Sequence, residues 1–116
     1  MGKKSRAKKE KRRRKKILFV CTANVCRSPM AERLFKRALI DRGLEDRFQV
    51  GSAGISAMDG DLASENSIDA CRELGLDITD HQSSALTRAS LQEASVIFCM
   101  TEPHRALLKD RKSTRL

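Results

Sequence analysis

Apolar and polar positions follow two different periods along this chain. The stretch "ILFV", Ile17–Val20, is a continuous run of apolar and mostly branched residues, which is typical of a strand buried on both faces of a parallel sheet. After Pro29, apolar residues recur every three or four positions and charged residues fall between them. This spacing predicts an amphipathic helix that opens at Pro29 and is stopped by Gly43.

The rest of the chain continues this alternation of strands and helices. "RFQVGSAGI", Arg47–Ile55, predicts a second strand that ends in a glycine-containing loop. A polar loop follows at Met58–Ser64, and Asn66–Leu74 has apolar residues at helical spacing before Gly75. "SVIFCM", Ser95–Met100, predicts a third buried strand.

Two shorter helices are expected beside the third strand. Ser90 with Glu93 three residues later fits a capping box, and Pro103 can open a helix that runs to about Arg111. Because strands and helices alternate, we expect an α/β fold, a parallel sheet with flanking helices and right-handed crossovers.

Positive charge is concentrated at the N-terminus. Residues 1–16 hold eleven Lys/Arg and one Glu, whereas residues 17–116 hold thirteen Lys/Arg and fourteen Asp/Glu. We therefore expect a disordered basic arm, 1–16, before a nearly neutral domain, 17–116. Such an arm suits an acidic partner, nucleic acid or anionic lipid, or serves as a solubilising extension. It contains no aromatic residue to stack on bases.

The four cysteines are expected to be reduced in a cytoplasmic protein. The only apolar run near the N-terminus, Ile17–Val20, is too short for a signal peptide or a transmembrane segment. Cys21 and Cys26 are spaced too widely for a zinc knuckle, and no second close pair follows. We therefore expect no metal site.

Candidate chemistry lies in "CTANVCRS", between the first strand and the first helix. Ligands of open parallel sheets bind at the carboxyl ends of the strands. A loop at that edge can direct several backbone N–H groups into one concavity, to which the helix dipole adds partial positive charge. Such a cradle suits an anion the size of phosphate.

The side chains of this loop fit nucleophilic chemistry. Cys21 is expected as the first loop residue, where the N–H groups would hold its sulfur as a thiolate nucleophile. Arg27 could bind two phosphoryl oxygens, and Ser28 could donate to the sulfur. Asn24 tolerates the positive φ that a tight cradle often requires. The alternative is that Cys21 and Cys26 are packed small hydrophobes.

Four segments together resemble the low-molecular-weight protein tyrosine phosphatases. They are "FVCTANVCRSPMAE", "GSAGI", "GLDITDHQSSALT" and "VIFCMTEPHRALL", in the same order as in that family, and the resemblance extends from Ile17 to about Asp110. It implies the phosphotyrosine protein phosphatase I fold, a parallel four-stranded sheet with helices on both sides. It also implies hydrolysis of phosphate monoesters through a phosphocysteine, without metal or cofactor.

The resemblance also implies roles for individual residues. Cys21 matches the nucleophile, Arg27 matches the phosphate-binding arginine, and Cys26 matches a cysteine that can form a reversible disulfide with the nucleophile. The phosphate-binding loop corresponds to Thr22, Ala23, Asn24, Val25, Cys26, Arg27 and Ser28. Positions that support this loop correspond to Asn24, Ser28, Glu32, Ser52 and His81.

Two residues of the phosphate-binding loop and one later segment depart from the family pattern or indicate the substrate. Ala23 stands where glycine is usual, so its methyl group is expected to crowd the cradle. Val25 favours phosphotyrosine, since relatives that act on phosphoarginine have threonine there. Ser56–Asp61 matches the wall of the substrate cleft but contains no aromatic residue.

The family's catalytic acid has no counterpart in this sequence. The acid is an aspartate in a late Asp-Pro pair, and the 116 residues contain no such pair. The resemblance therefore implies a domain that is incomplete at its C-terminus, without the last strand and helix. Without this acid, we expect weak activity on an aryl phosphate or a phosphoprotein. Without the last strand, we expect one side of the third strand to be uncovered.

Three other interpretations remain open at this point. One is a non-catalytic remnant that binds phosphate or phosphoproteins. Another is an arsenate reductase of the same fold, although Cys71 and Cys99 do not provide the close cysteine pair that a thiol relay needs. The last is a truncated gene product with no function of its own.

Overall fold

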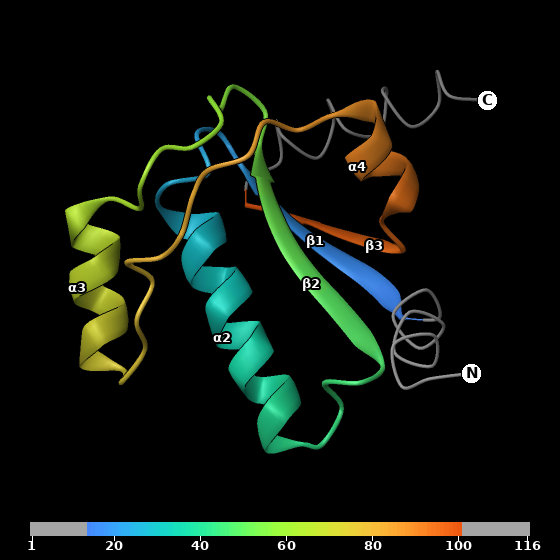
Figure 1. Ribbon diagram of the computed structural model, residues 1–116, viewed down its shortest axis with the longest axis horizontal. Helices are drawn as coiled ribbons and strands as arrows, with labels where there is room; N and C mark the ends of the chain where they lie inside the picture. Colours follow the sequence, from blue (N-terminus) through green and yellow to red (C-terminus); the bar gives the residue numbers. More distant parts are fainter. Residues whose placement is uncertain (1–13, 101–116) are drawn as a thin grey trace, which may run out of the picture.

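The computed structural model describes residues 14–100, which form a parallel sheet flanked by helices (Figure 1). The strands are β1 (Lys15–Cys21), β2 (Phe48–Gly54) and β3 (Val96–Cys99), in the order β2-β1-β3. The helices are α2 (Arg27–Asp41), α3 (Glu65–Glu73) and α4 (Arg88–Glu93). The predicted α/β class is confirmed. Most of the basic arm and the helix expected after Pro103 lie outside the described residues.

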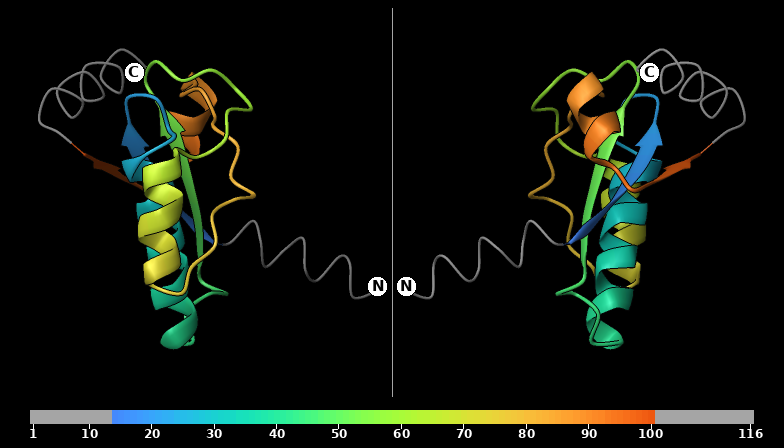
Figure 2. Two further views of the ribbon diagram at one scale, coloured as in Figure 1. Left: turned by 90° about the vertical axis from the view of Figure 1, so that its left-hand side faces the viewer. Right: turned by 90° about the vertical axis from the view of Figure 1, so that its right-hand side faces the viewer.

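Both faces of β1 are covered, as its apolar run predicts. Ile17 and Phe19 pack with Leu39 of α2 on one face, whereas Leu18 and Val20 join a cluster with α4 on the other. Side chains alternate between the faces because successive Cβ atoms of a strand point in opposite directions. A third cluster joins α3 to α2, which lie side by side (Figures 1 and 2).

The boundaries of β1 and α2 differ from the predicted ones. Strand β1 starts two residues before Ile17, because the backbone of Lys15 and Lys16 pairs with β2. The basic arm therefore does not extend through Lys16 as a separate segment, and Cys21 ends the strand rather than opening the loop. Helix α2 starts at Arg27, so Pro29 is its third residue. A proline is accommodated there because the first four N–H groups of a helix have no intrahelical partner.

The capping box predicted at Ser90 and Glu93 is wrong. Helix α4 is capped by Thr87, whose Oγ1 accepts the Ser90 N–H at 3.0 Å, while the Thr87 N–H donates to Ser90 Oγ at 3.4 Å. Ser90 is therefore the third helical residue, because the extended backbone of Thr87 begins the helix earlier. The ranges predicted for β2, α3 and β3 agree with the structure to within one residue at each end.

One face of β3 is open. Val96 and Phe98 are each 44% exposed, so the prediction of a buried third strand is wrong for this face. As expected for one side of this strand, β3 pairs with β1 alone among the described strands, so its other edge has no strand partner there. Phe98 still stacks on Phe19, with 5.3 Å between ring centroids. None of the helices in residues 14–100 has the length and apolar character needed to cross a bilayer.

Candidate active site

The turn between β1 and α2 surrounds a cavity of about 330 Å³. The cavity lies where the carboxyl end of β1 meets the N-terminus of α2. Its lining consists of six predicted site residues and one further residue, namely Cys21, Thr22, Ala23, Val25, Cys26, Arg27 and Met100. The structure therefore brings the candidate nucleophile and the candidate phosphate-binding arginine to one cavity.

The first half of the loop is bound to the chain that follows β2. The carbonyl oxygens of Cys21 and Thr22 accept the N–H groups of Ile55 and Ser56 at 3.0 and 2.9 Å. In a trans peptide the next N–H group points away from the carbonyl, and no cis peptide occurs in the described residues. The N–H groups of Thr22 and Ala23 are consequently directed away from these neighbouring segments.

The second half of the loop is bound to two more distant segments. His81 Nε2 lies 2.7 Å from the Asn24 carbonyl oxygen, and the Ser64 N–H donates to the Val25 carbonyl oxygen at 2.8 Å. Since a carbonyl only accepts, His81 carries a proton on Nε2. The N–H groups of Val25 and Cys26 again face the opposite way. With four carbonyls held outward, the loop can present its N–H groups to an anion.

The sulfur of Cys21 is met by two hydrogen-bonding groups. The Asn24 N–H donates to Cys21 Sγ at 3.2 Å, and Ser28 Oγ lies 2.8 Å from the sulfur. Asn24 Nδ2 donates to the same Ser28 oxygen at 2.7 Å, which leaves the Ser28 hydroxyl proton for the sulfur. Donors directed at sulfur stabilise its thiolate form.

Asn24 is the buried centre of the loop. It has the positive φ expected from the sequence, 58°, and its side chain is fully buried. Its Oδ1 accepts the Ser84 N–H at 2.8 Å, so the side chain ties Ser28 to the segment that follows His81. Among the described residues other than glycine, Asn24 alone has a positive φ. Ala23 therefore has an ordinary backbone; it is exposed and lines the cavity, so crowding by its methyl group stays a prediction.

The close contact occurs instead at Gly54, which the sequence reasoning did not single out. A Cβ atom at this position would lie 2.6 Å from the Thr22 carbonyl oxygen and 2.8 Å from the Asn24 nitrogen. Gly54 pairs with Cys21 at the ends of β2 and β1. The only signal in the sequence is a glycine at the end of a predicted strand, which is typical of a close backbone approach.

Arg27 is the first residue of α2. Its side chain is exposed and lines the cavity, and among residues 14–100 it takes part in no ion pair. Cys26 occupies the N-cap position without a side-chain capping bond, so the first-turn N–H groups and the positive end of the helix dipole point toward the loop. A guanidinium group here can bind two oxygens of one phosphoryl group.

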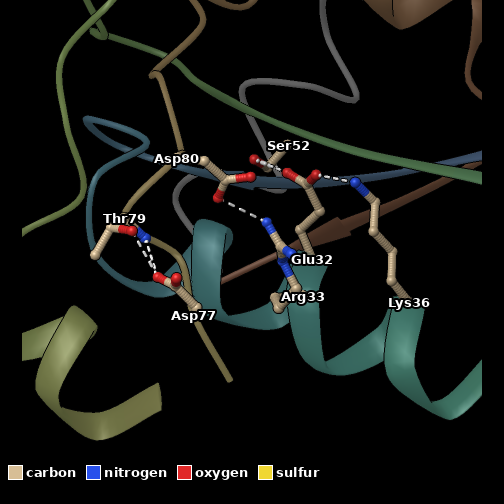
Figure 3. Close-up of polar contacts among 7 residues, drawn as sticks. All are labelled: Glu32, Arg33, Lys36, Ser52, Asp77, Thr79 and Asp80. Atoms are coloured by element: carbon tan, nitrogen blue, oxygen red, sulfur yellow. Dashed lines mark hydrogen bonds and ion pairs between the residues drawn. The ribbon is translucent and has the colours of Figure 1, made fainter. Parts of the chain in front are cut away.

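Glu32 and Ser52 lie in a separate polar cluster (Figure 3). Ser52 Oγ donates to Glu32 Oε1 at 2.5 Å, and Lys36 Nζ lies 2.6 Å from Glu32 Oε2. The two residues line a second cavity of about 440 Å³, which His81 also lines. In residues 14–100 neither of their side chains is hydrogen-bonded to the loop, whereas Asn24 and Ser28 bond within it and His81 bonds to it.

The remaining cysteines differ in accessibility. Cys26 is exposed and donates its S–H to Ser64 Oγ at 3.4 Å. Burial raises the pKa of the Cys71 thiol, although the Arg33 charge acts in the opposite direction. No three His, Cys, Asp or Glu side chains of the described residues are grouped as metal ligands.

The arrangement provides a nucleophile, hydrogen-bond donors and a cation, but it provides no nearby acid. Within residues 14–100 the cavity around Cys21 is lined by no Asp, Glu or His. Such a site can bind a phosphate monoester and displace its leaving group by attack of sulfur on phosphorus.

Comparisons with known proteins agree with this geometry. The family model described as low molecular weight phosphotyrosine protein phosphatase matches residues 16–115. The protein-arginine-phosphatase of Bacillus subtilis is 38% identical over 92 residues, which cover 79% of this chain and 59% of the relative. A probable low molecular weight protein-tyrosine-phosphatase, AmsI of Erwinia amylovora, is 38% identical over 88 residues, which cover 76% of this chain and 57% of the relative.

A solved structure is also similar to this chain in fold and sequence. The crystal structure of a YwlE mutant from Bacillus subtilis has a TM-score of 0.79 and 34% identity, covering 86% of this chain and 66% of that one. The chain thus spans less than two thirds of the length of the curated relatives named above, 57–59%.

Proposed function

The chain belongs to the low molecular weight phosphotyrosine protein phosphatase family, and from this we propose that it hydrolyses phosphate monoesters through a phosphocysteine on Cys21. The main support for this proposal is the hydrogen bonding of the loop between β1 and α2. Four of its carbonyls are bonded outward, and two groups converge on the Cys21 sulfur. A buried sulfur with donors around it is suited to attack phosphorus rather than to fill the core.

In the first step the phosphoryl group lies over Cys21. Loop N–H groups and the Arg27 guanidinium hold its oxygens and stabilise the charge that develops in the transition state. The sulfur forms a bond to phosphorus as the bond from phosphorus to the leaving oxygen breaks. Because no acid among the described residues lines the cavity, the leaving oxygen departs as an anion and takes its proton from water.

In the second step water attacks the phosphocysteine. The sulfur–phosphorus bond breaks, the water loses a proton to solvent, and inorganic phosphate is released. Cys21 leaves as a thiolate that accepts from the Asn24 N–H and from the Ser28 hydroxyl. These two contacts therefore assist the second step, since negative charge develops on the sulfur as the sulfur–phosphorus bond breaks.

The assignment is tested by turnover of p-nitrophenyl phosphate. We expect Cys21→Ser to lose nearly all activity, because a serine hydroxyl is a far weaker nucleophile than a thiolate. Cys99→Ser serves as a matched control, since Cys99 is half-buried on β3 and does not line the cavity. Equal rates for wild type and Cys21→Ser would remove the phosphatase assignment.

We propose phosphotyrosine proteins as the substrate class. Val25 lines the cavity with an apolar side chain, which suits an aromatic ring better than a guanidinium group. The two curated relatives are named for arginine and tyrosine substrates respectively. Parallel assays with phosphotyrosine and phosphoarginine peptides test this choice: wild type should prefer phosphotyrosine, and Val25→Thr should reduce that preference.

The basic arm is proposed to bind an anionic partner, on the basis of eleven Lys/Arg within residues 1–16. Binding to anionic vesicles and to RNA, measured across a salt series, tests this and separates the two sources of negative charge. A cytoplasmic location is also a proposal. It is supported by the fact that none of the four cysteines is in a disulfide.

A further inference from the structure

Ser64 joins the phosphate-binding loop to α3 through two atoms. Its N–H donates to the Val25 carbonyl oxygen at 2.8 Å, and its Oγ accepts the S–H of Cys26 at 3.4 Å. Ser64 follows Cys26 by 38 residues and is the N-cap of α3. Two consecutive loop residues therefore depend on one residue of a different element.

Ser64 is itself held firmly. Its Oγ donates to Ser67 Oγ at 2.8 Å and accepts the Ser67 N–H at 3.3 Å, and Ser67 is 3% exposed. Since the hydroxyl proton is used by Ser67, the oxygen faces Cys26 as an acceptor. Behind this contact, α3 packs against α2 through a cluster that includes Cys71, Ile78 and Met30.

These contacts fix the orientation of Val25 and Cys26, which form the outer half of the loop. With the Val25 carbonyl bound to Ser64, the N–H of Cys26 faces the opposite way. With the Cys26 thiol bound to Ser64, the side chain at the N-cap of α2 is fixed as well. The inner half of the loop, around Cys21, has separate supports in Asn24 and Ser28.

We propose that Ser64 is a positioning residue that aligns Val25 and Cys26 for binding of the substrate phosphate. This inference rests on the proposed phosphatase function. Ser64 acts on binding rather than on the attacking sulfur, because it contacts the outer half of the loop only. Removal of its hydroxyl group should weaken phosphate binding and raise KM about two- to tenfold, the effect of losing an ordinary hydrogen bond. It should change kcat less than KM.

Protection of Cys21 against alkylation measures phosphate binding directly. The rate of Cys21 modification by iodoacetamide is followed by peptide mass spectrometry at increasing inorganic phosphate, with wild type, Ser64→Ala and Ser64→Thr. We expect Ser64→Ala to need about two- to tenfold more phosphate for half-protection. Ser64→Thr keeps a hydroxyl acceptor and should behave like wild type.

Thr87→Ala is the matched control. Thr87 caps α4 as Ser64 caps α3, by accepting an N–H three residues later, and within residues 14–100 its side chain makes its hydrogen bonds to Ser90 rather than to the loop. Both alanine variants lose a helix cap, so both should melt at a lower temperature, but only Ser64→Ala should lose phosphate affinity. In a Cys26→Ala background the effect of Ser64→Ala should shrink, because the shared contact is already absent.

Two results would overturn the inference while leaving the proposed function intact. One is equal phosphate affinity for Ser64→Ala and Thr87→Ala, and the other is an undiminished Ser64→Ala effect on phosphate affinity in the Cys26→Ala background. Failure of the proposed function would look different, since phosphate would then give no protection of Cys21 even in the wild type.

Discussion

At the scale of single residues, the site depends on backbone groups more than on charged side chains. The sulfur of Cys21 is met by the N–H of Asn24, and the position of that N–H depends on how closely the loop approaches β2. Gly54 allows this approach, since its missing Cβ leaves room for the Asn24 nitrogen and the Thr22 carbonyl oxygen. The absence of a side chain at one position is therefore part of the site.

Gly54→Ala should inactivate the site without unfolding the protein. The added methyl group would meet Thr22 and Asn24 at less than 3 Å, so the loop must shift, and a misplacement of about 1 Å can reduce turnover roughly 10²-fold. Gly51→Ala is the control on the same strand, because its Cβ would meet nothing closer than 3.7 Å. Near-normal p-nitrophenyl phosphate turnover by Gly54→Ala would show that the loop does not need this close approach.

Residues of the site were predictable where their role is local. The positive φ of Asn24 follows from a residue type that tolerates it, and Ser28 lies four residues further on. Gly54 and Ser64 were missed because their partners lie about 30 to 40 residues away in the sequence. His81, which bonds to Asn24, 57 residues away, was predicted only through the family resemblance. Glu32 and Ser52 were expected at the loop but bind each other, since α2 carries Glu32 past the loop to a second cavity.

At the scale of elements, the strand–loop–helix unit formed by β1 and α2 could be predicted well, because a buried apolar run and an amphipathic period are both local patterns. The ends of these elements were less predictable. Lys15 and Lys16 enter β1 because the backbone of β2 pairs with them, whatever their side chains. The cap of α4 was misplaced because Thr87 and Ser90 are both good capping residues, and the extended backbone of Thr87 decides between them.

The open face of β3 predicts unequal roles for Phe98 of β3 and for Phe19 of β1, on which it stacks. Phe19 is 8% exposed and Phe98 is 44% exposed, although their rings are in contact. Phe19→Ala should lower the free energy of unfolding by about 3–5 kcal/mol, and Phe98→Ala should cost less than half of that. Urea unfolding followed by circular dichroism compares the two. Equal losses would mean that the face of β3 is covered in solution.

At the scale of the whole molecule, the described residues form the proposed phosphate cradle, and no Asp, Glu or His among them lines its cavity. The cavity at Cys21 is lined by one cation and no carboxylate, whereas the larger cavity is lined by paired charges and no cysteine. The 116 residues contain no Asp-Pro pair that could supply the acid. In the proposed reaction the leaving group then departs without a proton donated by a residue lining this cavity.

Turnover by the 116-residue chain should therefore depend steeply on the leaving group. A general acid typically contributes about 10²–10⁴-fold, and good leaving groups need it least. We expect p-nitrophenyl phosphate to react much faster than phenyl phosphate, with alkyl phosphates slower still. Similar kcat values across a series of substituted phenols would contradict this and indicate that an acid is present.

The central claim is that the Cys21 sulfur attacks phosphorus, and trapping of the intermediate tests it most directly. The protein is mixed with p-nitrophenyl phosphate, quenched with acid, and digested for peptide mass spectrometry. Cys71, whose pKa is raised by burial, serves as an internal reference that should remain unmodified. We predict one phosphoryl group on the peptide that contains Cys21, and none in Cys21→Ala. Phosphate protection of Cys21 with the substrate left intact and no phosphocysteine would contradict the claim and support a non-catalytic phosphate-binding protein instead.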